Sequence, residues 1–298
     1  MRWLVVGASG MLGQDVASTL TVRGHDVRTT GRSVLDGDAL NGHRALDITD
    51  ADACLAAAAG ADVVMNCAAY TAVDAAETDE AAAFAVNAVG AANLARAARR
   101  AGARLVQIST DYVFDGGAST PYAADAALAP RSAYGRTKAA GEWAVRAEAS
   151  DVLVVRTAWL YGAGGRCFPK TIARVAAERG GLDVVADQVG QPTWTMDLAD
   201  LVVRLVEANV PGGTYHGTSS GQASWHEFAR EVVAAAGLDP QIVRTTTSAA
   251  YVAPAPRPDY SVLGHGSLEA AGVTPIGPWR DRWAAASAAV LAPAVEAR

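Results

Sequence analysis

Tyr134 and Lys138 are the two side chains whose types and spacing point most directly to proton-transfer chemistry. Residues four apart on a helix share one face, with their Cβ atoms about 6 Å apart. Ser132 is a suitable N-cap, and the alanine-rich run over 139–145 favours a helix that carries both groups. Because a nearby ammonium favours the phenolate form of a tyrosine, we predict that Tyr134 is a general acid with Lys138 as its partner.

A hydroxyl follows the buried strand predicted over 104–109. Thr110 lies at the carboxyl end of this strand, where ligands sit in parallel sheets, and it can hydrogen-bond a substrate carbonyl beside the tyrosine. A simple strand-end cap is the alternative for Thr110, and the Tyr/Lys spacing alone also arises by chance in helices. The three residues together favour catalysis.

Gly7, Gly10 and Gly13 form a G-x-x-G-x-x-G run between a strand predicted over 3–6 and a helix predicted over 11–23. Glycines let the backbone turn tightly and approach a pyrophosphate, and the helix N-terminus supplies unpaired N–H groups. The position of this run at the start of the first strand–helix unit predicts dinucleotide binding rather than a merely tight turn.

The end of the second strand, predicted over 26–30, bears on the choice of dinucleotide. An acidic residue there binds a free ribose 2′-hydroxyl, while an arginine accommodates a 2′-phosphate. Arg32 therefore favours NADPH, although Asp36 and Asp38 lie close enough in sequence to leave NADH possible. Asp47 is a candidate for the adenine edge, with a loop or cap aspartate as its alternative.

The alternation of strands and helices in the first half predicts an α/β fold, a Rossmann-type doubly wound parallel sheet with helices on both faces. One long helix is expected over 77–101, interrupted by Asn87 and Gly90. Beyond residue 155 the alternation loosens, which predicts a smaller C-terminal α/β substrate-binding subdomain. We divide the chain into 1–158 plus about 195–221 for the dinucleotide, and about 159–194 plus 222–298 for the substrate.

Composition excludes several classes of function. The formal charge of −6 over 298 residues gives no basic stripe for nucleic acid and no polybasic membrane patch. No signal peptide and no apolar run of about 20 residues is present. The three cysteines are odd in number and widely spaced, which fits reduced thiols in the cytoplasm. Neither they nor the five scattered histidines have the spacing of a zinc site.

The chain resembles the extended short-chain dehydrogenase/reductase family, and within it the reductases of nucleotide-activated 4-keto-6-deoxy sugars. The likeness spans nearly the whole chain and rests on residues 7–13, 66–74, 109–116, 134–138, 156–161, 187–193 and 257–261. It implies that Tyr134 donates the proton, that Lys138 also bonds the nicotinamide ribose, and that Thr110 replaces the serine of most relatives. By the same resemblance, the substrate contacts are Asp111 and Trp159, and the cofactor is lined by Met11, Leu12, Asp47, Ile48, Ala68, Ala69 and Tyr70.

Further residues near the predicted substrate end are weaker candidates. Four polar side chains are candidates for the substrate diphosphate and base: Arg156, Arg166, Gln191 and Arg257. Trp159 is a candidate to stack on a sugar face, with a core tryptophan as its alternative.

The resemblance also raises the questions of a metal and of assembly. Some of these reductases hold magnesium with acidic residues at a dimer interface. Asp15 is available here, but Trp194, Thr195 and Met196 follow Pro192-Thr193 and offer no carboxylate before Asp197. We therefore predict no magnesium, and a monomer or homodimer. An epimerase or dehydratase with tightly held NAD⁺, and a non-catalytic NADP-binding regulatory subunit, are the alternative functions.

Overall fold

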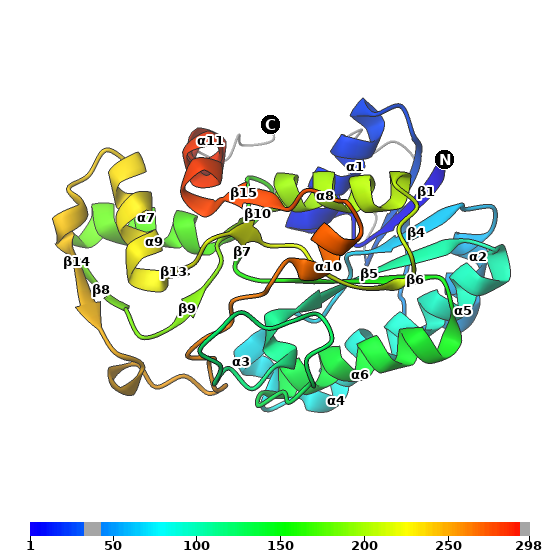
Figure 1. Ribbon diagram of the computed structural model, residues 1–298, viewed down its shortest axis with the longest axis horizontal. Helices are drawn as coiled ribbons and strands as arrows, with labels where there is room; N and C mark the ends of the chain where they lie inside the picture. The colour runs from blue at the N-terminus through cyan, green and yellow to red at the C-terminus, as the bar shows by residue number, and fades with distance from the viewer. Residues whose placement is uncertain (33–42, 293–298) are drawn as a thin grey trace.

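The computed structural model describes residues 1–32 and 43–292. Its centre is a parallel sheet of seven strands in the order β11-β6-β5-β4-β1-β2-β3, drawn edge-on in Figure 1. The strands are β1 (Arg2–Val6), β2 (Asp26–Gly31), β3 (Arg44–Ala45), β4 (Val63–Asn66), β5 (Arg104–Thr110), β6 (Val152–Thr157) and β11 (Gly213–His216). This sheet confirms the predicted doubly wound α/β class.

Helices cover both faces of the sheet because its strands are apolar on both sides. Trp3 and Val5 of β1 face a core shared with α1 (Met11–Val22) and α8 (Thr195–Glu207). Leu4 and Val6 face the opposite core, shared with α2 (Ala51–Ala58), α5 (Ala91–Ala101) and α6 (Ala133–Glu148). Strands buried on both faces are typical of parallel sheets.

The helix predicted over 77–101 runs from Glu80 to Ala101 and changes to π-helical geometry at the predicted interruptions, Asn87 and Gly90. The structure divides this region into α3 (Val73–Ala76), α4 (Glu80–Phe84), a π-helical segment (Ala85–Gly90) and α5. The π-helical segment surrounds Asn87, whose side chain bonds backbone groups outside the helix, and ends at Gly90, where a Cβ would lie 2.5 Å from Ile48. Contacts with neighbouring elements thus accompany a change from α-helical to π-helical geometry in a run that composition alone makes helical.

The C-terminal part builds a smaller unit at the left of Figure 1. Its aromatic core contains Tyr161, Phe228, Trp279 and Trp283. The helices are α7 (Phe168–Arg179), α9 (Trp225–Ala235) and α11 (Trp279–Leu291), and the short strands are β7 (Leu160–Tyr161), β8 (Leu182–Val185), β9 (Val189–Gly190), β10 (Thr193–Trp194), β12 (Ser219–Ser220), β13 (Ala223–Ser224), β14 (Val243–Thr246) and β15 (Ile276–Pro278). Helix α10 (Gly266–Ala270) lies instead against β11 of the large sheet.

The two units share chain segments. Helix α8 packs on α1, and β11 completes the large sheet beside β6. Leu268, Val273 and Ile276 also pack into the core between the sheet and these helices, although the sequence placed them in the substrate part. A capping box closes the start of α9, with Ser224 and Glu227 bonding each other's backbone N–H groups.

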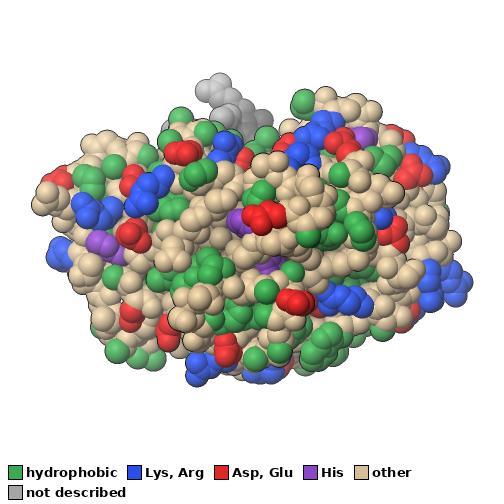
Figure 2. Space-filling view, in the orientation of Figure 1, with side chains coloured by type: hydrophobic (Ala, Val, Ile, Leu, Met, Phe, Trp, Pro, Cys, Tyr) green, Lys and Arg blue, Asp and Glu red, His purple; other side chains and the backbone are tan. Residues whose placement is uncertain are grey.

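The surface fits the mild charge balance. On the face shown in Figure 2, acidic and basic side chains are interspersed rather than gathered by sign. None of the described helices combines the length and the apolar character needed to cross a membrane.

Candidate active site

The loop between β1 and α1 forms a glycine cradle. Gly7 has a φ of +79°, and the N–H groups of Gly7 and Ala8 donate to the Thr30 carbonyl at 2.8 and 2.9 Å. A Cβ on Gly13 would lie 2.3 Å from the Gly7 oxygen. Within the described chain no side chain caps α1 at Gly10, so its first-turn N–H groups are available to an anion.

The exit of β4 lies against this cradle. A Cβ on Gly7 would be 2.7 Å from the Ala68 nitrogen, so the 68–70 segment borders the glycine loop. Asn87 fixes that segment, accepting from Tyr70 N–H at 2.8 Å and donating to the Tyr70 carbonyl at 3.1 Å. The same amide donates to Thr137 on α6 at 3.0 Å. Asn87 therefore links the cradle wall to the helix of Tyr134.

The predicted adenosine-side residues flank the same edge. Arg32 is exposed at the end of β2 and makes no ion pair within the described chain. Asp36 and Asp38 lie outside the described residues. Asp47 accepts from Thr49 N–H and Thr49 Oγ1 at 2.9 and 2.8 Å, the geometry of a turn, and these bonds lower its pKa. Ile48 is buried beneath it against Gly90.

Thr110, Tyr134 and Lys138 gather where β5 ends against α6. Ser132 caps α6 as predicted, accepting from Gly135 N–H at 3.0 Å. Tyr134 lies near enough to the Thr110 hydroxyl for that group to lower its pKa, and Lys138 Nζ donates to the Ile108 carbonyl at 2.7 Å. The structure therefore brings the three predicted catalytic side chains to one strand end, beside the Cys67 thiol.

The electrostatics of this trio differ from the prediction. Burial and the nearby Asp111 raise the pKa of Tyr134, while the adjacent Thr110 hydroxyl lowers it less. Lys138 is not among the groups that act on the phenol, so the predicted lowering of the Tyr134 pKa is not found. Burial lowers the pKa of Lys138 to about 8 and raises that of Cys67 to about 12.

Asp111 is buried directly below the catalytic hydroxyls. Its Oδ1 accepts from Thr110 Oγ1 at 2.9 Å, whereas Oδ2 has no hydrogen-bond partner among the described residues. The Ser261 hydroxyl lies near enough to lower the Asp111 pKa without a hydrogen bond of normal geometry. Burial outweighs these bonds and raises the pKa to about 6. A buried acceptor at this place suits a sugar hydroxyl.

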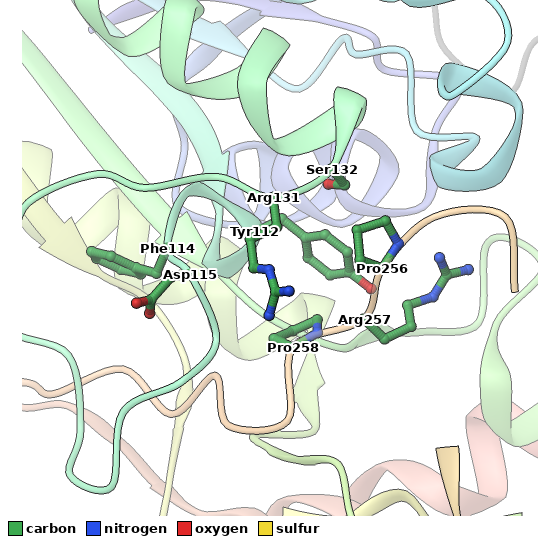
Figure 3. Close-up of a pocket in the computed structure, with 8 residues that line it drawn as sticks. All are labelled: Tyr112, Phe114, Asp115, Arg131, Ser132, Pro256, Arg257 and Pro258. Atoms are coloured by element: carbon green, nitrogen blue, oxygen red, sulfur yellow. The ribbon is translucent and has the colours of Figure 1, made fainter. Parts of the chain in front are cut away.

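A pocket opens beside α6, with Tyr112 at its centre (Figure 3). The Tyr112 hydroxyl points toward the segment of Pro256, Arg257 and Pro258. Arg257 donates to Asp74 Oδ2 at 2.8 Å, and Ala255 N–H donates to Oδ1 at 3.2 Å. The Asp74 carboxylate thus holds the 255–257 segment against α3. The remaining lining residues are Phe114, Asp115, Arg131 and Ser132.

Trp159 is held in an unusual conformation. Its φ is +47°, and its ring stacks on Trp225 with centroids 3.5 Å apart and planes inclined by 8°. A Cβ on Gly190 would lie 2.5–2.7 Å from three atoms of the same indole. The ring is therefore packed between Trp225 and the Gly190 backbone, which leaves its edge rather than a free face for a ligand.

Two of the weaker substrate candidates are wrong. Arg156 is buried, and its Nε and Nη2 donate to the two Glu142 oxygens at 2.9 and 2.8 Å. The Gln191 side-chain amide hydrogen-bonds backbone groups: it donates to the Ser219 and Leu263 carbonyls and accepts from Leu263 N–H. Neither group is free to bind a diphosphate. Arg257 borders the pocket, and Arg166 is exposed at the end of a loop that touches α1.

Sequence reasoning missed the supporting residues. Glu142 binds Arg156 and Ser109 beneath the catalytic trio, and Asn87 binds the cradle wall. A signal existed for each of them. Glu142 lies four residues after Lys138 on the predicted helix face, and Asn87 is a polar interruption of an alanine-rich run.

The carboxylates considered for magnesium do not come together. Asp15 is partly buried, and burial raises its pKa, while Asp197 pairs with Arg282 at 2.6 Å. No group of three or more metal-binding side chains occurs within residues 1–32 and 43–292. The absence of magnesium stays a prediction.

Comparison with known proteins decides the family. The family described as "RmlD substrate binding domain" matches residues 1–291. The chain belongs to this family. It is 48% identical over 286 residues to dTDP-4-dehydrorhamnose reductase of Streptomyces griseus, covering 94% of this chain and 90% of the relative.

One further relative and one solved structure are similar over nearly the whole chain. A probable dTDP-4,6-dihydroxy-2-methyloxan-3-one 4-ketoreductase of Streptomyces antibioticus is 49% identical over 286 residues, covering 94% of this chain and 92% of the relative. The crystal structure of the Bacillus anthracis dTDP-4-dehydrorhamnose reductase in complex with NADP aligns with a TM-score of 0.86 at 34% identity, over 94% of this chain and 96% of that chain. The fold and the family predicted from sequence are confirmed.

Proposed function

We propose that this protein is an NADPH-dependent oxidoreductase that reduces the C4 ketone of dTDP-4-dehydro-β-L-rhamnose to give dTDP-L-rhamnose. The observation that carries the proposal is the meeting of Thr110, Tyr134 and Lys138 at the carboxyl end of β5, next to the glycine cradle. Relatives of nearly equal length carry the corresponding reductase name.

The cradle fits a dinucleotide diphosphate. Gly7 and Gly13 leave no room for a Cβ, and the uncapped start of α1 offers N–H groups and positive potential. The groups proposed to hold NADPH are the loop from Gly7 to Gly13, the 68–70 segment, Arg32 at the 2′-phosphate, and Lys138 at the nicotinamide ribose. When bound there, NADPH supplies the hydride that the reduction requires.

The chain's own residues handle the proton and the developing charge. Tyr134 gives its phenolic proton to the oxygen of the reduced C4. The Thr110 hydroxyl, which donates to Asp111 Oδ1 in the structure, turns its proton to the same oxygen when the substrate is bound. Two donors aimed at one developing alkoxide stabilise the transition state more than the ground-state ketone. Lys138, held by the Ile108 carbonyl, keeps a positive charge one helical turn from the phenolate that remains.

The substrate is proposed to lie between the trio and the pocket of Tyr112. Asp111 Oδ2 offers a buried acceptor to a sugar hydroxyl, and Arg257 offers a cation to the diphosphate. Trp159 contributes the edge of its indole beside the sugar. The active form is proposed to be a cytoplasmic monomer or homodimer.

A second function follows from the spread of relatives. At 49% and 45% identity, relatives are named for reduction of a different dTDP-4-keto sugar and of dTDP-4-keto-6-deoxy-D-glucose. The catalytic trio serves any of these ketones. Another dTDP-4-keto-deoxysugar reductase is therefore the second candidate, and a tightly held NAD⁺ that is regenerated in each cycle would instead identify an epimerase or dehydratase.

The test is NADPH oxidation by the purified protein with dTDP-4-keto-L-rhamnose beside dTDP-4-keto-6-deoxy-D-glucose, followed by product identification. The proposal expects stoichiometric NADPH consumption and dTDP-L-rhamnose as product. Preference for another ketone selects the second candidate. Turnover of the nucleotide sugar without NADPH consumption, or NADPH binding without turnover of either sugar, contradicts both.

A further inference from the structure

Helix α6 carries a third charged side chain on the catalytic face. Tyr134, Lys138 and Glu142 are spaced four residues apart, so they follow one another along one side of the helix. Glu142 is only 1% exposed. A carboxylate this deeply buried persists only where several partners compensate for its lost hydration.

The partners of Glu142 come from the two strands beneath α6. Ser109 on β5 donates to Oε1 at 2.6 Å, and Arg156 on β6 donates to both oxygens at 2.9 and 2.8 Å. Ser109 immediately precedes Thr110. Arg146 on α6 adds a further positive charge 3.4 Å from Oε2 of Glu142. His216 on β11 lies 3.4 Å from Arg156 and is neutral, because burial lowers its pKa to about 4.

These bonds set the ionisation of the carboxylate. Burial alone would raise the pKa of Glu142, but the hydrogen bonds and charge of Arg156 lower it overall. Glu142 is therefore an anion inside the protein. Its charge supports the Lys138 ammonium, against the burial that lowers the Lys138 pKa. Cys67 is the other titratable group acting on Lys138.

We propose that Glu142 is a positioning residue for the reaction: its carboxylate fixes the Ser109–Thr110 end of β5 against α6 and keeps the Lys138 ammonium charged beside Tyr134. This inference rests on the proposed function. It assigns to one buried anion both the placement of the catalytic hydroxyl and the charge of the catalytic lysine.

A merely structural clamp is the competing explanation, and a variant must separate the two. Removing one partner of a buried ion pair leaves the other uncompensated, so Glu142→Gln risks unfolding. The double variant Glu142→Met, Arg156→Met replaces the whole pair by apolar side chains of similar size, which buried pairs often tolerate. The matched control is Glu148→Met, Arg96→Met, which removes a partly exposed pair at the far end of α6.

The sequence makes the lysine directly observable because it contains two lysines, Lys138 and Lys170. In protein labelled with ¹³C at the lysine ε-carbon, Lys170→Arg assigns the signals, and Lys138 is expected to titrate near pH 8. In the Glu142/Arg156 double variant we expect this midpoint to fall by about one pH unit. The control double variant should leave it unchanged.

The same displacement should appear in two functional measurements. Because protonated Lys138 supports the reaction, kcat/KM falls as pH rises through its pKa, and this alkaline limb should move to lower pH in the double variant. NADPH affinity, measured by quenching of tryptophan fluorescence, should weaken from the same lower pH. A folded double variant with the Lys138 titration of the parent protein overturns the electrostatic role, whatever its activity.

Ser109→Ala tests the placement role and keeps the ion pair. We expect kcat to fall about fivefold with KM unchanged, since Thr110 loses its neighbour's anchor to Glu142. An unchanged kcat overturns this part of the proposal, and this variant decides the matter if the double variant does not fold. A parent protein that reduces no 4-keto sugar refutes the proposed function instead, while the lysine titration still reports on Glu142.

Discussion

The two units of this molecule are held together by different means. The seven-stranded sheet is fixed by continuous ladders and by two apolar cores, and it presents the catalytic trio on one strand end and one helix. The smaller unit has an aromatic core of its own, but its strands are only two to four residues long, and single side chains such as Gln191 join its segments. The contrast teaches that the proposed chemistry lies where many backbone bonds fix the structure, and the proposed substrate selection lies where few bonds fix it.

The sharpest test of this contrast is Tyr134→Phe. Loss of the proton donor should lower kcat at least about a hundredfold, equivalent to about 2.7 kcal/mol, with NADPH affinity nearly unchanged. Tyr112→Phe is the control, since its ring lies edge-on to Tyr134 with centroids 5.7 Å apart. Steady-state kinetics and fluorescence titration measure both. Near-normal turnover in Tyr134→Phe would refute the catalytic role.

The smaller unit should respond through stability instead. Gln191→Leu leaves two carbonyls and one N–H buried without partners, which should lower the free energy of unfolding by roughly 2–3 kcal/mol. Gln188→Leu removes a single bond to Ser248 and should have an effect below about 1 kcal/mol. Urea unfolding compares the two variants. Equal effects would show that Gln191 does not join the segments as described.

Asp111, at the boundary of the units, should make stability depend on pH. Its folded pKa of about 6 lies above the ordinary value, so the folded protein keeps a proton that the unfolded chain has already released. Its contribution to stability therefore falls as pH rises from about 4 to 6. Relative to the parent, Asp111→Asn should gain on the order of 2 kcal/mol between pH 4 and pH 7. A constant difference in urea unfolding across that range would contradict the raised pKa.

The smallest effect is expected for Arg257→Lys. A lysine keeps the charge but loses the paired geometry toward Asp74 and a diphosphate, so KM for the nucleotide sugar should rise about tenfold while kcat stays within about threefold. Arg244→Lys, in an exposed pair with Asp183, should leave both constants unchanged. A fall in kcat with KM unchanged would show that Arg257 acts in the chemical step and not in substrate binding.

Local spacing made the first unit readable from the sequence. The glycine run, the Ser132 cap and the Tyr134/Lys138 pair are set by neighbours within a few residues, and the structure places them accordingly. Arg156 and Arg257 carry the same charge and were both candidates for the diphosphate, yet one pairs with buried Glu142 and the other with Asp74, 183 residues away. No local pattern encodes such a choice. The interruption of the 77–101 helix at Asn87 is visible in the sequence, but the partners of Asn87, Tyr70 and Thr137, are not.

The left-handed backbone of Trp159 has a consequence for engineering. A side chain with a Cβ in this conformation costs on the order of 1 kcal/mol or more, so glycine would be locally easier there. Yet glycine would empty the space between Trp225 and Gly190. A search for thermostable variants that places glycine at position 159 would therefore remove the aromatic packing beside the proposed sugar site. Substitutions to raise thermal stability are better made elsewhere.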